Sequence, residues 1–363
     1  MDLTGDSSSR KPHCLGRMTS VCTMRSLSKQ LRLRATILFF MLTAAICSEP
    51  RLEQSNLLFI MFDDLRPELS IYGRDHMITP NFERLAARSV IFDNVHAQIS
   101  VCNPSRDSML TGLRPDTIGT YSFQSSFRPH LTLPSRLASV GYNTAAYGKI
   151  AHWETTEKTV WSHDHWNGAW YDYQQFEWNI MNSSTMPDRI KPEEEFRDYL
   201  FASKTIETLK VLNEKQEYFM LGVGFKLPHL AVHIPYKYYD MYKGRESGWK
   251  LTQEELRFPE TAPAISYRCC ASADFQFMEQ EGSKRSKHKV PIGNINDAFT
   301  HKMHEELMIG YAAGVTFVDR QLGRILDAID QLELWGNLTV VLTADHGMHN
   351  GEKGIWCVSV CIS

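Results

Sequence analysis

The sequence predicts an α/β protein whose mostly parallel sheet is flanked by helices on both faces. Continuous apolar runs, typical of strands buried on both faces, recur along the chain, as at Asn56–Phe62 and Leu338–Thr343. Segments with helical spacing of apolar residues separate these runs, as crossover connections between parallel strands require. The length of 363 residues and the hydrophobic content of 43% are enough to bury the core of one large domain.

The predicted elements alternate along the chain in an order that suits parallel crossover units. Strands are expected at residues 56–62, 90–95, 144–147, 218–223 and 338–343, and helices at 82–88, 135–140, 193–213 and 304–332. Two stretches without a clear period, 153–192 and 243–296, are expected to be surface loops that shape a substrate site. The aromatic residues from Trp161 to Trp178 either pack the first loop onto the core or form a wall that stacks on sugars.

Residues 1–48 are expected to form a targeting region that precedes the fold. Two arginines lie before an apolar run at residues 35–46, and small or polar residues follow it, as in a secretory signal peptide. The run is shorter than the roughly 20 apolar residues that span a bilayer, so no stable membrane span is expected. A signal-anchor is the alternative, and Met18 and Met24 are alternative start residues.

The overall charge and the modification motifs favour a secreted protein that does not bind nucleic acid. The formal net charge is −3, without the basic face of a nucleic-acid binder. Sequons at Asn182 and Asn337 support passage through the secretory pathway. The eight cysteines are too sparse for a small disulfide-stapled fold, and their pairing does not follow from the sequence.

Acidic residues follow two of the predicted buried strands. Asp63 and Asp64 come directly after the first strand, and Asp345 and His346 come just after the last. In an open parallel sheet, ligands bind beyond the carboxyl ends of the strands, so both pairs are expected in one crevice. Converging carboxylates repel each other unless a cation holds them, and oxygen ligands indicate calcium or magnesium. Taken singly, each pair is also typical of a turn at a strand end.

A helix start is expected around Cys102. Asn103 is suited to the N-cap and Pro104 to the first turn, so a helix is predicted from here to about Gly112. The exposed N–H groups of its first turn create an anion site beside Cys102, and Arg106 adds a positive charge. From these residues alone, the cysteine is a candidate thiolate nucleophile.

The segment Cys102-Asn103-Pro104-Ser105-Arg106, followed by Thr111-Gly112, resembles the signature of the sulfatase family. The resemblance extends from Asn56 to about Trp356, implies the alkaline-phosphatase-like fold and favours the iduronate-2-sulfatase group of the family. Further matching segments are Asp63-Asp64-Leu65-Arg66-Pro67, Tyr72-Gly73, Thr79-Pro80-Asn81, Arg114-Pro115-Asp116-Thr117, Gly148-Lys149 with His152, Pro228-His229 and Asp345-His346-Gly347.

The resemblance implies a division of the chain and also marks two departures from the family pattern. The expected parts are a signal region at 1–48, an N-terminal catalytic domain at 54–356 and a divergent tail at 357–363, with the family's C-terminal subdomain absent. Val358 stands where a second sulfate-binding lysine is expected. Leu227 stands where relatives place a lysine, and Lys226 precedes it by one position.

The resemblance also implies roles for individual residues. Cys102 becomes formylglycine, whose hydrate attacks sulfur, and Arg106 and Lys149 neutralise the sulfate. His229 protonates the leaving oxygen, and His152 orients or deprotonates the hydrate. Without the family context, Lys149 and His229 are also typical of ordinary loop residues. One calcium ion per chain is expected, with Asp63, Asp64, Cys102, Asp345 and His346 as its ligands.

The predicted activity is hydrolysis of sulfate esters on glycosaminoglycans such as heparan or dermatan sulfate, in a lysosomal or extracellular compartment. The formylglycine-generating enzyme is the implied protein partner. A phosphate-cleaving relative of the same superfamily is disfavoured, because such enzymes carry Ser or Thr at the position of Cys102. A catalytically impaired secreted homologue that binds sulfated glycans is the other alternative; the absence of the family's C-terminal part favours it, and the intact set of site residues disfavours it.

Overall fold

The fold is described from a computed structural model of the chain. It describes residues 54–122, 130–152, 161, 165–166, 185–230, 232–245, 249, 251–252, 255, 275–277, 286–288, 301–352 and 356–357. The signal region, the sequon at Asn182, the end of the tail beyond Cys357 and most of the two predicted long loops lie outside these residues. Within them, no helix combines the length and apolar character that crossing a bilayer requires.

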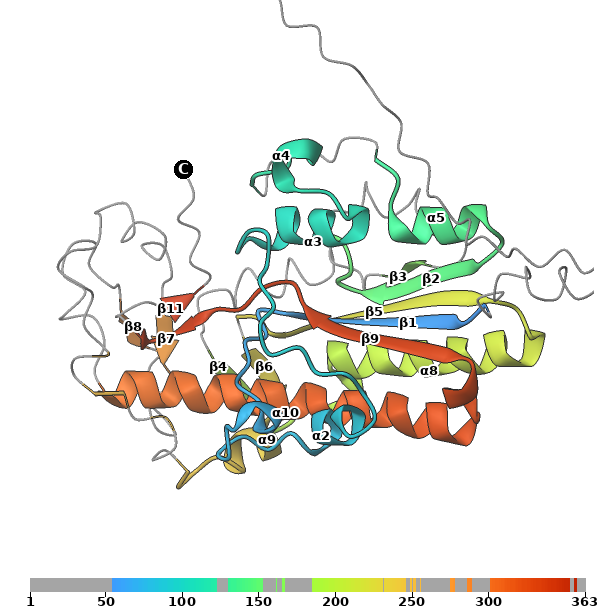
Figure 1. Cartoon of the computed structure of the whole chain (residues 1–363). Helices are drawn as coiled ribbons and strands as arrows, with labels where there is room; N and C mark the ends of the chain where they lie inside the picture. The colour runs from blue at the N-terminus through green and yellow to red at the C-terminus, as the bar shows by residue number, and fades with distance from the viewer. Residues whose placement is uncertain are drawn as a thin grey trace, which may run out of the picture. The chain divides into compact units, whose positions relative to one another are not determined.

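A five-stranded sheet forms the centre of the described part of the chain, in the order β3-β2-β5-β1-β9 (Figure 1). All of its neighbouring strands are parallel, which confirms the predicted sheet. The strands are β1 (Asn56–Asp63), β2 (Asn143–Gly148), β3 (His165–Trp166), β5 (Phe219–Pro228) and β9 (Leu338–Ala344). Four of them match predicted strands.

The strand predicted at residues 90–95 is wrong. The segment is irregular and exposed, with Val90 at 80% and Phe92 at 70% of their full accessibility. β-Branched and aromatic residues favour a strand only where a sheet face receives their side chains. The described sheet offers no such face here, so the local preference is not realised.

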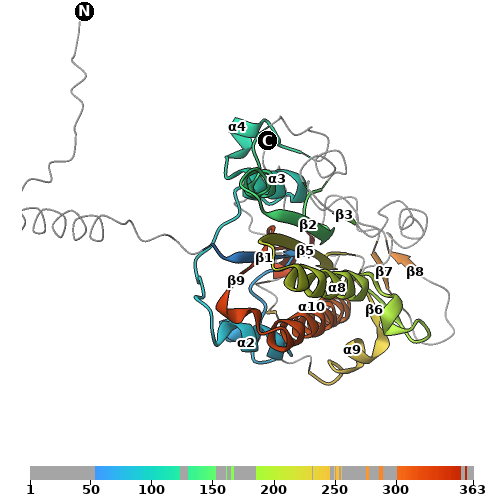
Figure 2. The same cartoon turned by 90° about the vertical axis from the view of Figure 1, so that its right-hand side faces the viewer.

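Helices cover both faces of the sheet, as predicted. One face carries α8 (Arg197–Lys215) and the long α10 (His301–Gln331), with the short α2 (Pro80–Ala86) and α9 (Tyr236–Asp240) packed against α10. The opposite face carries α3 (Cys102–Thr111), α5 (Leu133–Ser139) and, beyond α3, α4 (Pro115–Ile118). Figure 2 shows the three layers edge-on, with α3 on one side of the strands and α8 and α10 on the other.

The alternation of side chains along the strands divides the core into two clusters. In β1, Leu58, Ile60 and Phe62 join the large cluster under α8 and α10, whereas Phe59 and Met61 join a small cluster under α3. Trp161 is buried in this small cluster, which agrees with a packing role for this residue of the aromatic stretch.

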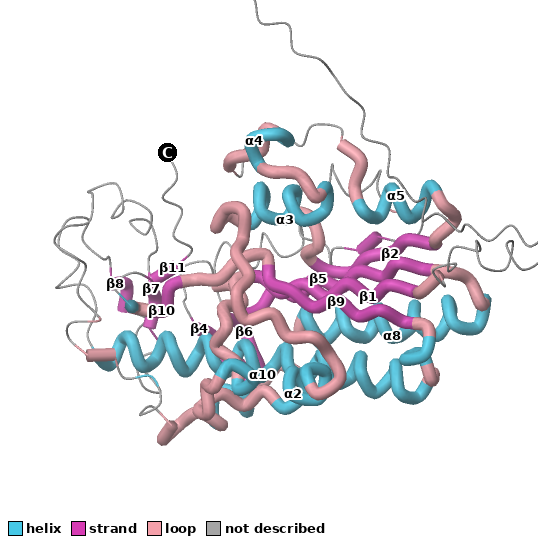
Figure 3. Tube along the Cα trace, viewed as in Figure 1, coloured by secondary structure: helices cyan, strands magenta, loops and turns pink. Residues whose placement is uncertain are grey.

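Several short elements surround the sheet (Figure 3). They are the 3-10 helices η1 (Ser70–Tyr72), η2 (Glu193–Glu195) and η6 (Leu334–Gly336), and the paired strands β4 (Thr185–Asp188) with β6 (Val232–Pro235), β7 (Phe275–Phe277) with β8 (Ser286–His288), and β10 (His349–Asn350) with β11 (Trp356–Cys357). The regions predicted as plain loops therefore contain short strands, β3 and β4 in residues 153–192 and the pair β7–β8 in residues 243–296.

Candidate active site

The two acidic turns meet at the carboxyl ends of neighbouring strands. Phe62 of β1 lies beside Ala344 of β9, which brings Asp63 next to Asp345 although the two are far apart in the sequence. The backbone N–H of Asp345 donates to the carbonyl of Phe62 at 3.1 Å, and that of Asp64 donates to Oδ1 of Asp345 at 3.1 Å. Asp64 has a φ of 63°, a left-handed conformation in which the chain leaves the strand. The two acidic pairs therefore lie side by side, as the sequence predicts.

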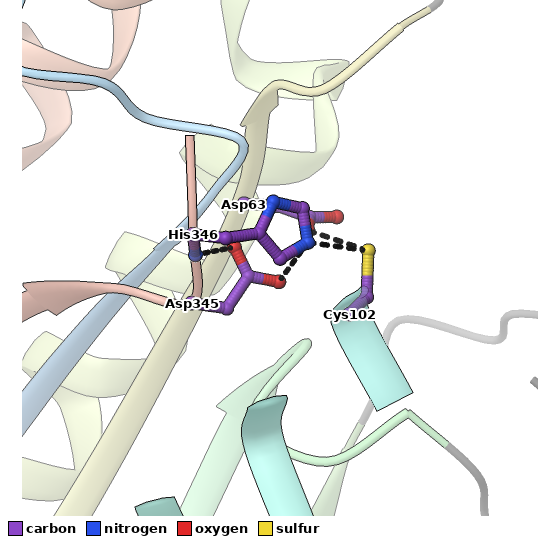
Figure 4. A group of neighbouring side chains, drawn as sticks. All are labelled: Asp63, Cys102, Asp345 and His346. Carbon is purple, nitrogen blue, oxygen red and sulfur yellow. Dashed lines mark hydrogen bonds and ion pairs between the residues drawn. The ribbon is translucent and has the colours of Figure 1, made fainter. Parts of the chain in front are cut away.

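Cys102 opens α3 and points at these turns (Figure 4). Its Sγ lies 3.5 Å from Oδ1 of Asp63 and 3.2 Å from Nε2 of His346. The hydroxyl of Ser105, one turn further on, donates to the backbone carbonyl of Asp345. The start of α3 is therefore fixed directly against the carboxylates.

The predicted N-cap of this helix is wrong by two residues. The N-cap is Val101, so Asn103 already lies inside the first turn of α3. Asn103 is buried, and its side-chain amide donates to the carbonyl of Ser122 at 2.9 Å. The helix ends as predicted, with Gly112 left-handed at a φ of 67°. Tertiary contacts rather than a capping side chain set where α3 begins.

Arg106 is completely buried between the two acidic turns. Its Nη2 lies 3.1 Å from Oδ1 of Asp63, and its Nε lies 2.9 Å from Oδ2 of Asp345. It also donates to the carbonyls of Lys149 and Ile150. Burial opposes the charge of Arg106, but Asp345 and Asp63 raise its pKa above the usual range, so it stays cationic.

Lys149 reaches the same carboxylates from the end of β2. Its Nζ pairs with Oδ2 of Asp63, and its backbone N–H donates to the carbonyl of Gly224 at 2.8 Å. The backbones of β2 and β5 approach closely here, since a Cβ on Gly148 would lie 2.1 Å from that carbonyl oxygen. Gly148 has a φ of 77°, so both its conformation and the available space exclude a side chain.

The pKa values of the three carboxyl groups, Asp63, Asp64 and Asp345, are shifted in different directions. Burial alone would raise the pKa of Asp63, but Lys149, His229 and Arg106 hold it well below its ordinary value. Burial and the repulsion of Asp63 and Asp345 raise the pKa of Asp64 well above its usual range. Burial also raises the pKa of Asp345, in spite of Arg106. Of the three, only Asp63 therefore has a pKa lowered by its cationic neighbours.

These side chains fit a divalent cation. Ligand atoms of Asp63, Cys102, Asp345 and His346 all lie within 4.8 Å of one another. Oδ1 of Asp64 is buried and receives no hydrogen bond from the described part of the chain, although Nδ1 of His346 lies 3.3 Å away. A buried carboxylate oxygen that lacks a hydrogen-bond donor and lies beside two further carboxylates, here Asp63 and Asp345, is typical of a site for a hard metal ion.

His152 and His229 lie near the buried charged residues of the site, and the pKa values of both are lowered. Burial, and then the positive charges of Lys149 and Arg106, lower the pKa of His152 to about 3. Burial and the nearby Lys149 and Lys226 likewise lower the pKa of His229 to about 3, although Asp63 opposes the shift. His229 follows β5, and its Nδ1 contacts the carbonyl of Leu230. The chain thus brings both histidines into the electrostatic range of Lys149.

The structure adds residues that the sequence did not single out. The hydroxyl of Tyr311, in the middle of α10, donates to the carbonyl of Asp64 at 3.1 Å and accepts the N–H of Arg66 at 3.0 Å. Arg66 itself pairs with Glu352, beyond the second acidic turn. Tyr311 has no sequence signal, because an aromatic residue at this position of an amphipathic helix is typical of the core.

Known proteins with similar sequences are sulfatases. A family model described as Sulfatase matches residues 55–357. Iduronate 2-sulfatase of Mus musculus is 30% identical over 321 residues, which cover 83% of this chain and 56% of that protein. The enzyme of the same name from Homo sapiens is 30% identical over 319 residues, with the same coverage. The chain thus spans a little over half the length of these curated relatives.

Solved structures share the fold at lower sequence identity. A phosphonate monoester hydrolase of Agrobacterium radiobacter superposes with a TM-score of 0.63 at 18% identity, covering 84% of this chain and 64% of that one. A protein solved in complex with its substrate D-glucosamine-2-N,6-O-disulfate gives 0.61 at 20% identity, covering 84% and 68%. These similarities confirm the alkaline-phosphatase-like fold. The match of the family model over residues 55–357, most of the chain, shows that the chain belongs to the sulfatase family.

Proposed function

We propose that this chain hydrolyses sulfate esters, with residue 102 as formylglycine in place of cysteine. The observation that carries the proposal is the position of Cys102. It lies at the first turn of α3, against Asp63 and His346, with the cations Arg106 and Lys149 beside those partners. A plain thiolate is disfavoured here, because burial and the charge of Asp63 raise the pKa of the Cys102 thiol well above its usual value.

Two groups complete the proposed site. Formylglycine, when formed, supplies a hydrated aldehyde oxygen as the nucleophile that attacks sulfur. A divalent cation, proposed to be one Ca²⁺ per chain, supplies positive charge that favours the ionised nucleophile. Asp63, Asp64, residue 102, Asp345 and His346 would hold this cation. The surrounding cations limit the negative charge of the site before substrate arrives.

The remaining residues have separable roles. Lys149 is mostly buried and extends to Asp63, so it supplies positive charge close to where sulfate would lie. Arg106 is fully enclosed by Asp63, Asp345 and the carbonyl of Lys149, so it positions these groups while adding to the positive potential. His152 is proposed to orient or deprotonate the hydrate; its pKa of about 3 makes it a weak base until bound sulfate offsets the charges of Lys149 and Arg106.

His229 has the opposite requirement, since protonation of the leaving oxygen needs an acid. Its pKa is lowered to about 3 by burial and by Lys149 and Lys226. The negative charge of bound sulfate would offset these cations and raise that pKa toward the protonated form. His229 is therefore proposed to become the acid only in the substrate complex.

The proposed substrates are 2-sulfated uronic acids of heparan or dermatan sulfate. This proposal rests on the 30% identity to iduronate 2-sulfatase and on the motifs shared with that group. The substrate varies within the family. Other similar proteins are named an N-acetylglucosamine-6-O-sulfatase, at 25% identity, and a choline-sulfatase, at 24% identity. Similarity at these identities supports a shared fold but does not identify the sugar that carries the sulfate.

The proposed location is the secretory pathway, ending in a lysosome or outside the cell. The targeting region at 1–48 and the proposed modification of residue 102 by the formylglycine-generating enzyme agree with this route. Asn337 is exposed at the turn before β9, as an N-glycosylation site must be. The catalytic domain is proposed to occupy residues 54–356, ahead of a divergent tail at 357–363.

A second candidate function is binding of sulfated glycans without turnover. The observation that favours it is the lack of a lysine at Val358 and at Leu227, where the family pattern places sulfate-binding cations. Loss of a charge-assisted contact to sulfate would remove a few kcal/mol of transition-state stabilisation. Binding would persist through Lys149 and the start of α3.

Mass spectrometry of the peptide that carries residue 102 tests the proposal first. The full chain would be secreted from a eukaryotic cell, and sulfate release would be measured from an aryl sulfate and from a fluorogenic 2-sulfated iduronide. Formylglycine together with sulfate release that Cys102→Ala abolishes supports the enzyme. Unmodified cysteine in well-secreted protein would refute it. Formylglycine without turnover, but with retention on heparin, would favour the second candidate.

A further inference from the structure

We propose that Arg66 and Glu352 form a clamp that positions the two metal-binding turns, so that both residues set the cation affinity of the site without touching the cation. The inference rests on the metal site of the proposed function. The first turn is Asp63-Asp64 after β1, and the second is Asp345-His346 after β9. Arg66 follows the first turn and Glu352 follows the second, and their side chains join the two segments.

The Arg66 side chain contacts the second segment at two points. One Nη atom pairs with Oε1 of Glu352, and the same atom lies 3.4 Å from the carbonyl oxygen of Met348. The backbones also meet, because a Cβ on Gly347 would lie 3.1 Å from the Cβ of Arg66. Gly347, directly after the second turn, therefore packs against Arg66, two positions after the first turn.

Glu352 in turn fixes its own segment. Its Oε2 accepts the backbone N–H of Asn350 at 2.9 Å, while Oε1 is occupied by Arg66. Nδ1 of His349 lies 3.6 Å from Oε1. The Glu352 carboxylate thus holds the segment after the second turn through Asn350 and joins this segment to Arg66.

Tyr311 holds the first segment from the opposite side. Its hydroxyl bridges the carbonyl of Asp64 and the N–H of Arg66, so α10 fixes the backbone on both sides of Leu65. The ring is buried, and burial raises the pKa of the hydroxyl, so it remains a neutral donor and acceptor. Arg66 therefore extends from a fixed backbone position.

The turns benefit from such support because bringing their carboxyl groups together costs free energy. Asp64 has a left-handed backbone at a φ of 63°, which costs free energy in a residue with a side chain. The carboxyl groups of Asp63, Asp64 and Asp345 are all buried, and they lie close together at the ends of neighbouring strands. A clamp between the segments keeps the carboxylates close before a cation binds, which lowers the cost of assembling the site on binding.

Calcium affinity of the full chain, measured by isothermal titration calorimetry, tests the clamp. The variants are Arg66→Ala, Arg66→Lys, Glu352→Gln and the double variant Arg66→Ala/Glu352→Gln. The matched control is Arg84→Ala, which removes another arginine–carboxylate pair, at 2.7 Å from Asp327, that links α2 to α10. Thermal unfolding of each variant in chelator gives the change in stability separately from the change in affinity.

The clamp predicts about 10-fold weaker calcium binding for Arg66→Ala and for Glu352→Gln. The double variant should be no weaker than the worse single variant, because the two residues act as one unit. Arg66→Lys should recover little, since an ammonium does not reach Glu352 and the Met348 carbonyl together. Arg84→Ala should lower the melting temperature without changing affinity.

Two results would overturn the inference, and they are distinguishable. Clamp variants that melt earlier but bind calcium as the parent does would show that the ion pair only stabilises the fold. A parent chain that binds neither calcium nor magnesium would remove the metal site of the proposed function, and the clamp with it. Because Glu352→Gln is nearly isosteric, it keeps the test decisive even if Arg66→Ala does not fold.

Discussion

The two faces of the sheet differ in the side chains that the central strand β5 presents to them. Toward α8 and α10, β5 presents Leu221, Val223 and Phe225, which are completely buried in the large apolar cluster. Toward α3, the same strand presents Gly222 and Gly224, whose missing side chains would meet the segment at Lys149 and Ile150. Between Leu221 and Phe225, the large side chains of β5 are therefore on one face, and the glycines on the other leave room for the chain to fold back on the strand.

This difference separates stability from chemistry. Apolar burial supplies roughly 25 cal/mol per Å², so the α8–α10 face provides most of the driving force for folding. The α3 face instead encloses Asp63, Arg106 and Asp345, whose desolvation opposes folding unless every charge is paired. The glycines of β5 bring Lys149 to these charges. A reactive group of buried charges is therefore held on a sheet whose opposite face stabilises it.

The largest effect is expected from Arg106→Met. The change leaves Asp63 and Asp345 buried without their shared guanidinium, so the free energy of unfolding in chelator should fall by about 3–5 kcal/mol. Sulfate release, if present in the parent, should be lost. Urea unfolding followed by circular dichroism gives the stability.

The control for Arg106→Met is Arg84→Met, which removes an arginine that is 36% exposed and pairs with Asp327 and Asp330. Exposed pairs contribute about 0–1 kcal/mol, so this change should be small. Equal losses in the two variants would contradict the view that the α3 face depends on mutually paired buried charges.

Leu221→Ala should affect the opposite face alone. Leu221 is fully buried in the large cluster, so its truncation should lower the free energy of unfolding by about 2–5 kcal/mol through lost apolar burial and the resulting cavity. Calcium affinity of the folded variant should equal that of the parent. A shift in affinity without a change in melting temperature would break the proposed separation of the two faces.

A pair of glycine substitutions tests how closely the α3 face is fitted. In Gly224→Ala the new Cβ would lie 2.0 Å from the carbonyl oxygen of Lys149, a backbone atom, so the β2 end must move. In Gly222→Ala the nearest atoms are Cγ1 of Ile150 at 3.2 Å and Cβ of Ala146 at 3.3 Å, which are side-chain atoms and lie more than 1 Å farther away. The first change should cost about 1–3 kcal/mol and weaken any sulfate release, and the second should cost less. Equal effects would show that the approach at Lys149 is not required.

Much of the sheet and the meeting of the acidic turns could be predicted from the sequence. β1 and β9 are continuous apolar runs, and strands of this kind are determined by local composition. Asp63 and Asp345 could be placed together because parallel strands end at one edge. β5 was predicted to end at Val223, yet it continues to Pro228 because pairing with β1 and β2 continues through its glycines.

The parts that escaped prediction depend on contacts between distant segments. The start of α3 is set by burial against β1 and by Ser105 on Asp345, which no capping motif reports. Tyr311 is indistinguishable from a core residue until its hydroxyl is seen between Asp64 and Arg66. The apolar segment at 90–95 has the local composition of a strand but lacks a described partner, so its preference alone did not determine its structure.

The smallest expected effect concerns pH and a carboxyl group far from the α3 face. Asp319 of α10 accepts the N–H groups of Asn81 and Phe82, both at 2.9 Å, and so holds the start of α2. Burial nevertheless raises its pKa to about 6. A raised folded-state pKa contributes stability that is full below the unfolded value and is lost as pH rises through about 6. From pH 4.5 to 7, the parent should therefore lose about 2 kcal/mol relative to Asp319→Asn in paired urea titrations. Because groups at the site titrate alike in both proteins, they cancel in this difference. Parallel pH profiles would show that these two N–H groups and the side-chain amide of Asn81, which donates to Asp319 at 2.7 Å, keep Asp319 ionised. The apolar face would then contain a permanent buried charge, as the α3 face does.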